Sequence, residues 1–330
     1  MNTTTKINSA KLFEIIKSSQ SVLISSHEEP DGDSIGSQLA LLQLITNLGK
    51  NGLILNRGTI PFKYRFLPDI ALINDITKYD GGMNFDLAIV LECPGLERTG
   101  GAEKLVTPET LIINIDHHPD NRNFGTVNYL DSEISSVGEM LAELFIEADI
   151  PIDQKTATWL YAAILTDTGR FRYGSTKRRT MEIAGRLIEA GANQRDICDN
   201  IYYSLPSSTL LLTGAVLSGI SFFENGKICL LQLEQSTLEK NGADLSEADG
   251  LTDFSLFGHG VIVGGLLKEI NGNRTKVSLR SRDSLDVSRL AHKYGGGGHH
   301  SAAGFMIELP LEAARKVVLE ELKEIVNGSI

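Results

Sequence analysis

The sequence predicts an α/β protein in which an N-terminal parallel sheet, with helices on both faces, precedes a smaller mixed α+β domain. Three observations support this. The length of 330 residues favours two domains, and 42% hydrophobic residues suffice for two cores. In the first half, short apolar runs alternate with helical patterns, as in parallel sheets buried on both faces. In the second half, Asn-Gly pairs join apolar segments, which favours hairpins.

The first domain is expected over residues 1–191. Its elements follow from apolar runs of strand length and from longer stretches with helical periodicity. A first helix is predicted at 6–18, and strands then alternate with helices up to a final helix that ends at Gly191. The expected strands are 21–27, 51–56, 85–92 and 110–118, and the expected helices are 34–49, 135–148, 156–167 and 176–191.

A connector is predicted at 192–213, where the pattern is weak, and a second domain at 214–330. Two hairpins are expected there, one turning at Asn225-Gly226 and one at Asn271-Gly272. A glycine-rich segment and an amphipathic helix near 311–326 complete the domain.

Charge and cysteine content narrow the classes of function. A net charge of −11 argues against a long nucleic-acid track, because phosphate binding needs basic surface. Three widely spaced cysteines indicate a reducing compartment rather than a disulfide scaffold. No apolar run approaches the length of a membrane span. These observations predict a cytoplasmic protein without a membrane partner; they are compatible with a homodimer but do not specify the oligomeric state.

Metal-capable side chains gather just after the predicted strands and at the end of one helix. Ligand sites in parallel sheets lie outside the carboxyl ends of the strands, so these residues are expected to meet at one edge. Each of them alone is more often a structural or surface residue than a ligand, but together they predict a site. They are His27, Asp31, Asp33, Glu92, Asp116, His117, His118 and Asp167.

The chemistry of this set favours two divalent cations. Carboxylate and imidazole ligands without thiolate favour Mn²⁺, with Mg²⁺, Co²⁺ or Fe²⁺ as alternatives. Two such cations clamp a phosphoryl group and activate water, and one carboxylate must bridge them. An anionic substrate also needs positive donors, which His118, Arg170 and Arg172 are placed to supply.

Four segments resemble the motifs of the DHH phosphoesterase family. They are "SHEEPDGDSIGS", "DHH", "TDTGRFR" and "GGGGHHSAAGF", and they follow the family order from residue 26 to 305. The length and spacing are similar to the nano-RNase/pAp phosphatase branch. The resemblance implies hydrolysis of very short oligoribonucleotides and of 3′,5′-bisphosphonucleosides, including conversion of pAp to AMP.

The resemblance also implies roles for single residues. His27 and Asp31 would bind one metal, and Asp33, His117 and Asp167 the other, while Asp116 orients the ligands and His118 contacts phosphate. The family normally offers a bridging aspartate where this chain has Glu92 in "LECPGLER". Glutamate has the same charge on a side chain longer by one methylene, so bridging by Glu92 is an expectation here.

The second domain is expected to bind substrate. Gly296, Gly297 and Gly298 would let a phosphate or ribose approach the backbone. His299 matches the family's histidine after the glycines. Arg280 and Arg282 alternate along a predicted strand, where they either hold the distal end of the substrate or form a solvated face.

Three other functions are compatible with parts of the sequence. A phosphodiesterase for linear or cyclic dinucleotides would use the same site. An inorganic pyrophosphatase would share the N-terminal motifs but would not need the glycine-rich segment. A catalytically impaired, nucleotide-sensing protein is kept open by Glu92 and disfavoured by the intact "DHH" and "TDTG". Turnover of a two-nucleotide RNA with Mn²⁺ would separate these functions.

Overall fold

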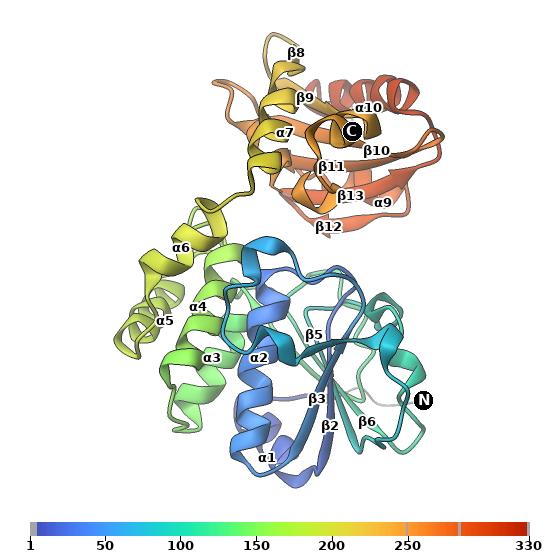
Figure 1. The fold of residues 1–330 in the computed structure, drawn as a ribbon. Helices are drawn as coiled ribbons and strands as arrows, with labels where there is room; N and C mark the ends of the chain where they lie inside the picture. Colours follow the sequence, from blue (N-terminus) through green and yellow to red (C-terminus); the bar gives the residue numbers. More distant parts are fainter. Residues whose placement is uncertain (1–4, 249, 283–284, 329–330) are drawn as a thin grey trace. The chain divides into compact units, whose positions relative to one another are not determined.

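The computed structural model of the protein describes residues 5–248, 250–282 and 285–328 (Figure 1). The chain divides into two compact units, Met1–Ser204 and Leu205–Ile330. The first holds a parallel sheet and the second a mixed sheet, which confirms the predicted fold class. Among the described helices, none has both the length and the apolar character needed to cross a membrane.

The sheet of the first unit has seven strands within the described residues, and every neighbouring pair is parallel. The strands are β1 (Thr5–Lys6), β2 (Ser21–Ser25), β3 (Asn51–Asn56), β4 (Ile73–Asp75), β5 (Leu87–Leu91), β6 (Leu111–Asp116) and β7 (Val127–Leu130). Their order is β1-β7-β6-β5-β2-β3-β4. The sequence did not predict β1, β4 and β7, because runs of two to four residues carry too little periodicity to be recognised.

Helices cover both faces of this sheet. Alternation along the strands sends Ile24 into the main core under the α-helices and Leu23 into a smaller cluster on the other face. Ile76 and Ala102, from short 3₁₀ helices, pack against that smaller cluster. The α-helices are α1 (Ser9–Ser18), α2 (Gly32–Asn47), α3 (Val137–Glu147), α4 (Gln154–Asp167), α5 (Arg178–Glu189) and α6 (Gln194–Tyr202). The 3₁₀ helices are η1 (Phe62–Tyr64), η2 (Ile70–Leu72), η3 (Ile76–Lys78), η4 (Leu96–Thr99) and η5 (Ala102–Lys104).

Helices α2, α3 and α4 lie side by side (Figure 1), and glycines allow two close approaches between them. A Cβ atom on Gly36 would lie 2.3 Å from the carbonyl oxygen of Trp159, so α2 and α4 could not approach as closely with any larger residue. A Cβ atom on Gly138 would lie 2.5 Å from the Cβ of Ala163. These contacts set the positions of Asp33 in the first turn of α2 and Asp167 at the end of α4.

The second unit has a six-stranded sheet within the described residues, in the order β12-β13-β11-β10-β9-β8. Both predicted hairpins are confirmed, because β8 pairs antiparallel with β9 and β10 pairs antiparallel with β11. Helices α9 and α10 pack on one face, and α7 and α8 on the other. The elements are α7 (Ser207–Ser218), β8 (Ser221–Phe223), β9 (Ile228–Leu233), α8 (Gln235–Asn241), η6 (Leu245–Ala248), η7 (Leu251–Leu256), β10 (Val263–Asn271), β11 (Arg274–Ser281), α9 (Ser288–Lys293), β12 (Gly297–His299), β13 (Ala302–Ile307) and α10 (Leu311–Val326).

The predicted connector at 192–213 contains all of α6 and the first part of α7. Helix α6 belongs to the first unit, where Ile197 and Ile201 enter the main core. Helix α7 belongs to the second unit, where Leu212 and Val216 are buried. The weak pattern has a physical cause: α6 is short, and α7 is apolar on nearly all sides and lacks a polar face that would mark its period.

Candidate metal centre

The candidate metal centre lies in the first unit, at the carboxyl ends of the parallel strands. The loop after β2 carries His27 and Asp31 and leads into α2 with Asp33. Glu92 follows β5, and β6 ends at Asp116, directly before His117 and His118. The last residue of α4 is Asp167. Strands β2, β5 and β6 are neighbours in the sheet, which is why these segments meet although they are far apart in the sequence.

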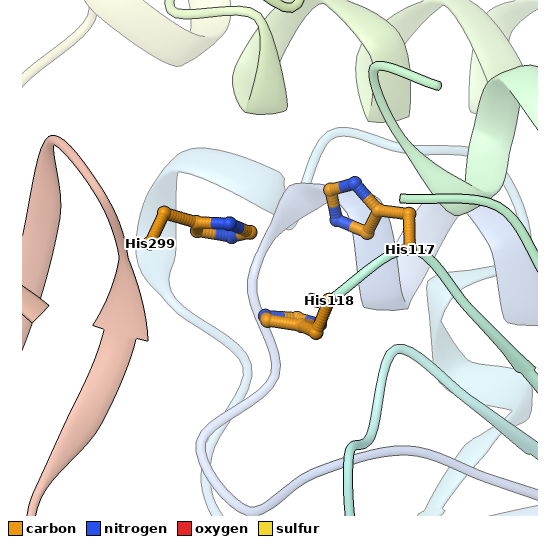
Figure 2. Close-up of side chains that lie close together, drawn as sticks. All are labelled: His117, His118 and His299. Carbon is orange, nitrogen blue, oxygen red and sulfur yellow. The ribbon is translucent and has the colours of Figure 1, made fainter. Parts of the chain in front are cut away.

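His117 is at the middle of the cluster. Its Nε2 atom lies 3.3 Å from Oε1 of Glu92 and 3.4 Å from Oδ2 of Asp167. Asp33, Glu92 and His117 are all buried, and each offers a ligand atom within 4.8 Å of those of the other two. Figure 2 shows the ring of His117 beside that of His118; their centroids are 5.0 Å apart, with an interplanar angle of 62°.

Asp33 is held by the first turn of α3. Its Oδ2 accepts a hydrogen bond from the backbone N–H of Val137 (2.7 Å), and its Oδ1 accepts from Gly138 (2.8 Å). The Ser37 hydroxyl donates to Oδ1 at 3.1 Å. The N-terminus of α3 favours a carboxylate at this point, and these three hydrogen bonds orient the Asp33 side chain.

Glu92 reaches the cluster through an unusual backbone turn. Its φ angle is +55°, in the left-handed region that few non-glycine residues adopt. The Asn114 side chain stabilises this turn, because its Nδ2 donates to the carbonyls of Val90 (3.2 Å) and Cys93 (3.1 Å) on either side of Glu92. The Oε2 atom of Glu92 is buried and has no hydrogen-bond partner among the described residues.

Asp116 orients the second histidine. Its Oδ1 accepts from Nδ1 of His118 at 2.7 Å and from the backbone N–H of His117 at 2.9 Å. Its Oδ2 accepts from Nδ2 of Asn121 at 2.5 Å. These contacts hold the Nδ1 edge of the His118 ring against Asp116, so the Nε2 edge faces away from Asp116.

His27 and Asp31 form a neighbouring pair. His27 Nε2 lies 2.9 Å from the Ser34 hydroxyl and 4.0 Å from Oδ1 of Asp31. The same Asp31 oxygen caps α2 by accepting from the backbone N–H of Ser34 at 3.0 Å. The motif residues therefore begin the helix as well as facing the site, which accounts for their short spacing in the sequence.

Burial and neighbouring charges shift the pKa values of four residues in the cluster, Glu92, Asp116, His117 and Asp167. Burial raises the pKa of Glu92 well above its usual value, and His117 offsets this only in part. Burial also raises the pKa of Asp167 to about 7. Burial lowers the pKa of His117, but the charges of Glu92 and Asp167 outweigh it and raise the pKa well above normal. For Asp116, burial is outweighed by the hydrogen bond from His118, and the pKa is lowered.

The donor set fits divalent cations. Carboxylate oxygens and imidazole nitrogens converge here, and the buried Oε2 of Glu92 lacks the partner that such an atom normally has. Cations at this point would satisfy that oxygen and neutralise the repulsion among the carboxylates.

Arg170 and Arg172 follow the site in the chain and are exposed. Residues 169–171 all have positive φ angles, which turns the chain sharply after Asp167. The guanidinium of Arg170 stacks 4.7 Å from the ring of Tyr202, and that of Arg172 lies 5.4 Å from the ring of Tyr173. Their assignment to the substrate remains a prediction.

The predicted substrate residues of the second unit lie on or directly beside β11 and β12, and β12 pairs with β13. A Cβ atom on Gly296 would lie 2.1 Å from the carbonyl oxygen of Gly304, and Gly298 has a φ angle of +136°, so both positions require glycine. Gly297 and His299 belong to β12, where they pair with Gly304 and Ala302 of β13.

The two arginines of the predicted basic face differ. Arg280, on β11, donates from Nε to Oδ1 of Asp253 at 3.0 Å and is partly exposed. Arg282 lies just after β11 and donates to the carbonyls of Val261 (2.7 Å) and Leu256 (3.1 Å). These contacts favour a structural role for Arg282, because its guanidinium binds carbonyls at both ends of the loop from Leu256 to Val261 and so braces that loop.

Sequence reasoning missed the two asparagines that support the site. Asn114 interrupts the apolar run of β6, which is a signal that could have identified it, because a polar residue in a buried strand needs partners. Asn121 lies in a polar loop, where nothing in its local sequence distinguishes it from an ordinary turn residue.

Comparison with known proteins places this site in context. Residues 21–164 match the family described as "DHH family, N-terminal domain", and residues 239–328 match the "DHHA1 domain". "Bifunctional oligoribonuclease and PAP phosphatase NrnA" of Thermus thermophilus is 30% identical over 314 residues, covering 94% of this chain and 92% of that protein. The protein of the same name from Bacillus subtilis is 28% identical over 311 residues, covering 90% and 92%. The crystal structure of an exopolyphosphatase-related protein from Bacteroides fragilis has a TM-score of 0.89, with 26% identity and coverage of 96% and 95%.

Proposed function

The chain belongs to the DHH family, and on that basis we propose that it is a Mn²⁺-dependent phosphohydrolase that degrades very short oligoribonucleotides and converts pAp to AMP. The relatives from Thermus thermophilus and Bacillus subtilis carry names for both activities. The three cysteines are free, which supports a reducing, cytoplasmic setting.

The observation that carries the proposal is the convergence of Asp33, Glu92 and Asp167 on His117. We assign His27 and Asp31 to one cation, Asp33, His117 and Asp167 to the second, and Glu92 to both. The unpartnered Oε2 of Glu92 supports the bridging assignment, because the other oxygen of the same carboxylate already faces His117. Bound cations would supply the Lewis acidity that activates water and offsets phosphate charge.

The remaining residues act on the substrate. His118, fixed through Nδ1 by Asp116, presents a ring N–H to a phosphate oxygen and stabilises the charge that develops there. Arg170 and Arg172 supply further positive charge to the anionic substrate. In the second unit, Arg280 and the glycine-rich segment ending at His299 bind the nucleoside. Arg282 braces the adjoining loop.

The net charge of the chain supports the proposed preference for short substrates. The net charge of −11 argues against the extended basic surface that a long strand requires. Affinity therefore depends on the few phosphates close to the site, and hydrolysis of RNA should not improve beyond a few nucleotides.

The test is hydrolysis of a two-nucleotide RNA and of pAp by protein stripped with a chelator. Added Mn²⁺ should restore both activities, and an Asp167→Asn variant should remain inactive on both. Full activity in excess chelator would contradict the two-metal site. Rapid degradation of a thirty-nucleotide RNA would contradict the substrate class.

A phosphodiesterase for dinucleotide signals is the second candidate, because a linear dinucleotide presents the same ester to the same site. Hydrolysis of such a dinucleotide without release of phosphate from pAp would favour it. Nucleotide binding without turnover would instead indicate a sensing protein.

A further inference from the structure

Asn121 connects the loop after β5 with the end of β6 behind the two histidines. Its Nδ2 lies 2.5 Å from Oδ2 of Asp116, 2.7 Å from Oδ1 of Asn114 and 3.3 Å from the carbonyl oxygen of Cys93. An amide has two N–H groups, and the two short contacts assign them to Asp116 and Asn114. The Oδ1 of Asn121 accepts from the backbone N–H of Asn123 at 2.7 Å, which fixes the orientation of the amide.

Asp116 transmits this restraint to His118. The carboxylate is planar, so holding Oδ2 also sets the direction of Oδ1, which accepts from Nδ1 of His118 at 2.7 Å. Asp116 is fully buried, so water cannot replace a lost donor at Oδ2 without rearrangement. Asn114, itself fully buried, anchors the other end of the chain of contacts on the carbonyls of Val90 and Cys93.

We propose that Asn121 is a positioning residue for the proposed hydrolysis. It holds the Asp116 carboxylate in the one orientation that keeps the imidazole of His118 directed to the substrate phosphate. This inference rests on the proposed function and adds a residue to it. Asn121 contacts no substrate; its effect passes through Asp116 and His118.

A double-mutant cycle tests whether Asn121 affects hydrolysis through His118. Asn121→Ala should lower kcat on the two-nucleotide RNA by about 10- to 100-fold, as loss of such an outer partner typically does, while KM and bound Mn²⁺ stay close to the parent values. In a His118→Ala background, Asn121→Ala should lower kcat no further, because the residue on which it acts is gone. Losses that multiply in the double variant would overturn the proposal. Asn123→Gly, which keeps the backbone donor to Asn121, is the matched control and should behave as the parent.

A measurement without substrate separates this inference from the proposed function. In ¹⁵N spectra of the Mg²⁺-loaded protein, the Nδ1–H group of His118 that donates to Asp116 should give a single sharp signal, assigned by its loss in His118→Ala. Asn121→Ala should convert this signal into a broadened or mixed one. An unchanged His118 signal in Asn121→Ala would overturn the positioning role even if the parent hydrolysed no nucleotide. Inactivity of the parent with the expected spectral change would overturn only the function.

Discussion

Nε2 of His117 lies 3.3 Å from Oε1 of Glu92, although the two residues are 25 positions apart. The contact arises because β5 and β6 are adjacent parallel strands and both end at the same edge of the sheet. Only the left-handed turn at Glu92 brings its longer side chain back to this edge. The pair therefore joins two motifs into one centre.

Glu92→Gln should reduce bound Mn²⁺ from two ions per chain to one or fewer, because an amide lacks the charge needed to bridge two cations. Hydrolysis of pAp should fall by at least about 100-fold with the loss of one charge-stabilising group. Metal analysis of gel-filtered protein measures the first effect. Glu97→Gln, on the exposed part of the same loop, is the control; two ions retained in Glu92→Gln would refute bridging.

Alanine variants of the two neighbouring histidines should lose activity for different reasons. His117→Ala removes the imidazole between Glu92 and Asp167, so metal stoichiometry should fall. His118→Ala should keep its metal and lose about 10²–10³ in kcat, as expected for one lost oxyanion donor. Equal loss of metal in both variants would show that the roles are not divided.

The metal-free protein should become less stable as the pH rises through 7. Burial raises the pKa of Asp167 to about 7, and carboxylate neighbours outweigh burial to raise that of His117. The folded state then holds more protons than the unfolded chain, so the free energy of unfolding falls as those protons leave.

Calorimetry of chelated protein between pH 6 and pH 8 measures this as a falling Tm. Mn²⁺ should remove most of the fall, because cations replace the protons. Asp167→Asn should flatten the profile in the absence of metal. If the Tm of the chelated parent does not decrease over this range, the raised pKa values of Asp167 and His117 in the metal-free protein are contradicted.

Arg280→Ala and Arg282→Ala should separate binding from stability. Loss of Arg280 should raise KM for pAp by about 10-fold, which corresponds to one hydrogen bond to a charged group. Loss of Arg282 should cost about 1–2 kcal/mol of unfolding free energy, because the carbonyls of Leu256 and Val261 lose their donors. Denaturant titration and steady-state kinetics on both variants distinguish the effects; a stable Arg282→Ala with a raised KM would reverse the assignment.

Gly36→Ala should destabilise the first unit by about 1–3 kcal/mol, because the added methyl group overpacks the contact between α2 and α4. The shift would also move Asp33 relative to Asp167, so affinity for Mn²⁺ should fall. Gly185→Ala is the control, since no atom lies within 4 Å of the position that its methyl group would take on α5. That variant should gain about 0.5–1 kcal/mol from lower backbone entropy in the unfolded chain.

Much of the fold could be predicted because its long elements carry strong periodicity. The apolar runs of β2, β5 and β6 and the hairpin turns at Asn225-Gly226 and Asn271-Gly272 are local signals, and the structure confirms them. The weaker elements could not be predicted. Helix α7 is apolar on nearly all sides, and β7 is four residues long, so tertiary packing rather than local pattern decides both.

The candidate site likewise has features that the sequence predicts and features that only the folded structure reveals. The amino-acid sequence alone shows that carboxylates and histidines follow several strands, and it predicts a site because the carboxyl ends of parallel strands meet at one edge of a sheet. The folded chain is needed to see that Glu92 turns into the site through a left-handed backbone, and that Arg282 is occupied by carbonyls. The same holds for the support that Asn121 gives to Asp116. The physical reason is that these outcomes depend on hydrogen bonds between segments distant in the chain, and the geometry of such bonds has no local signature.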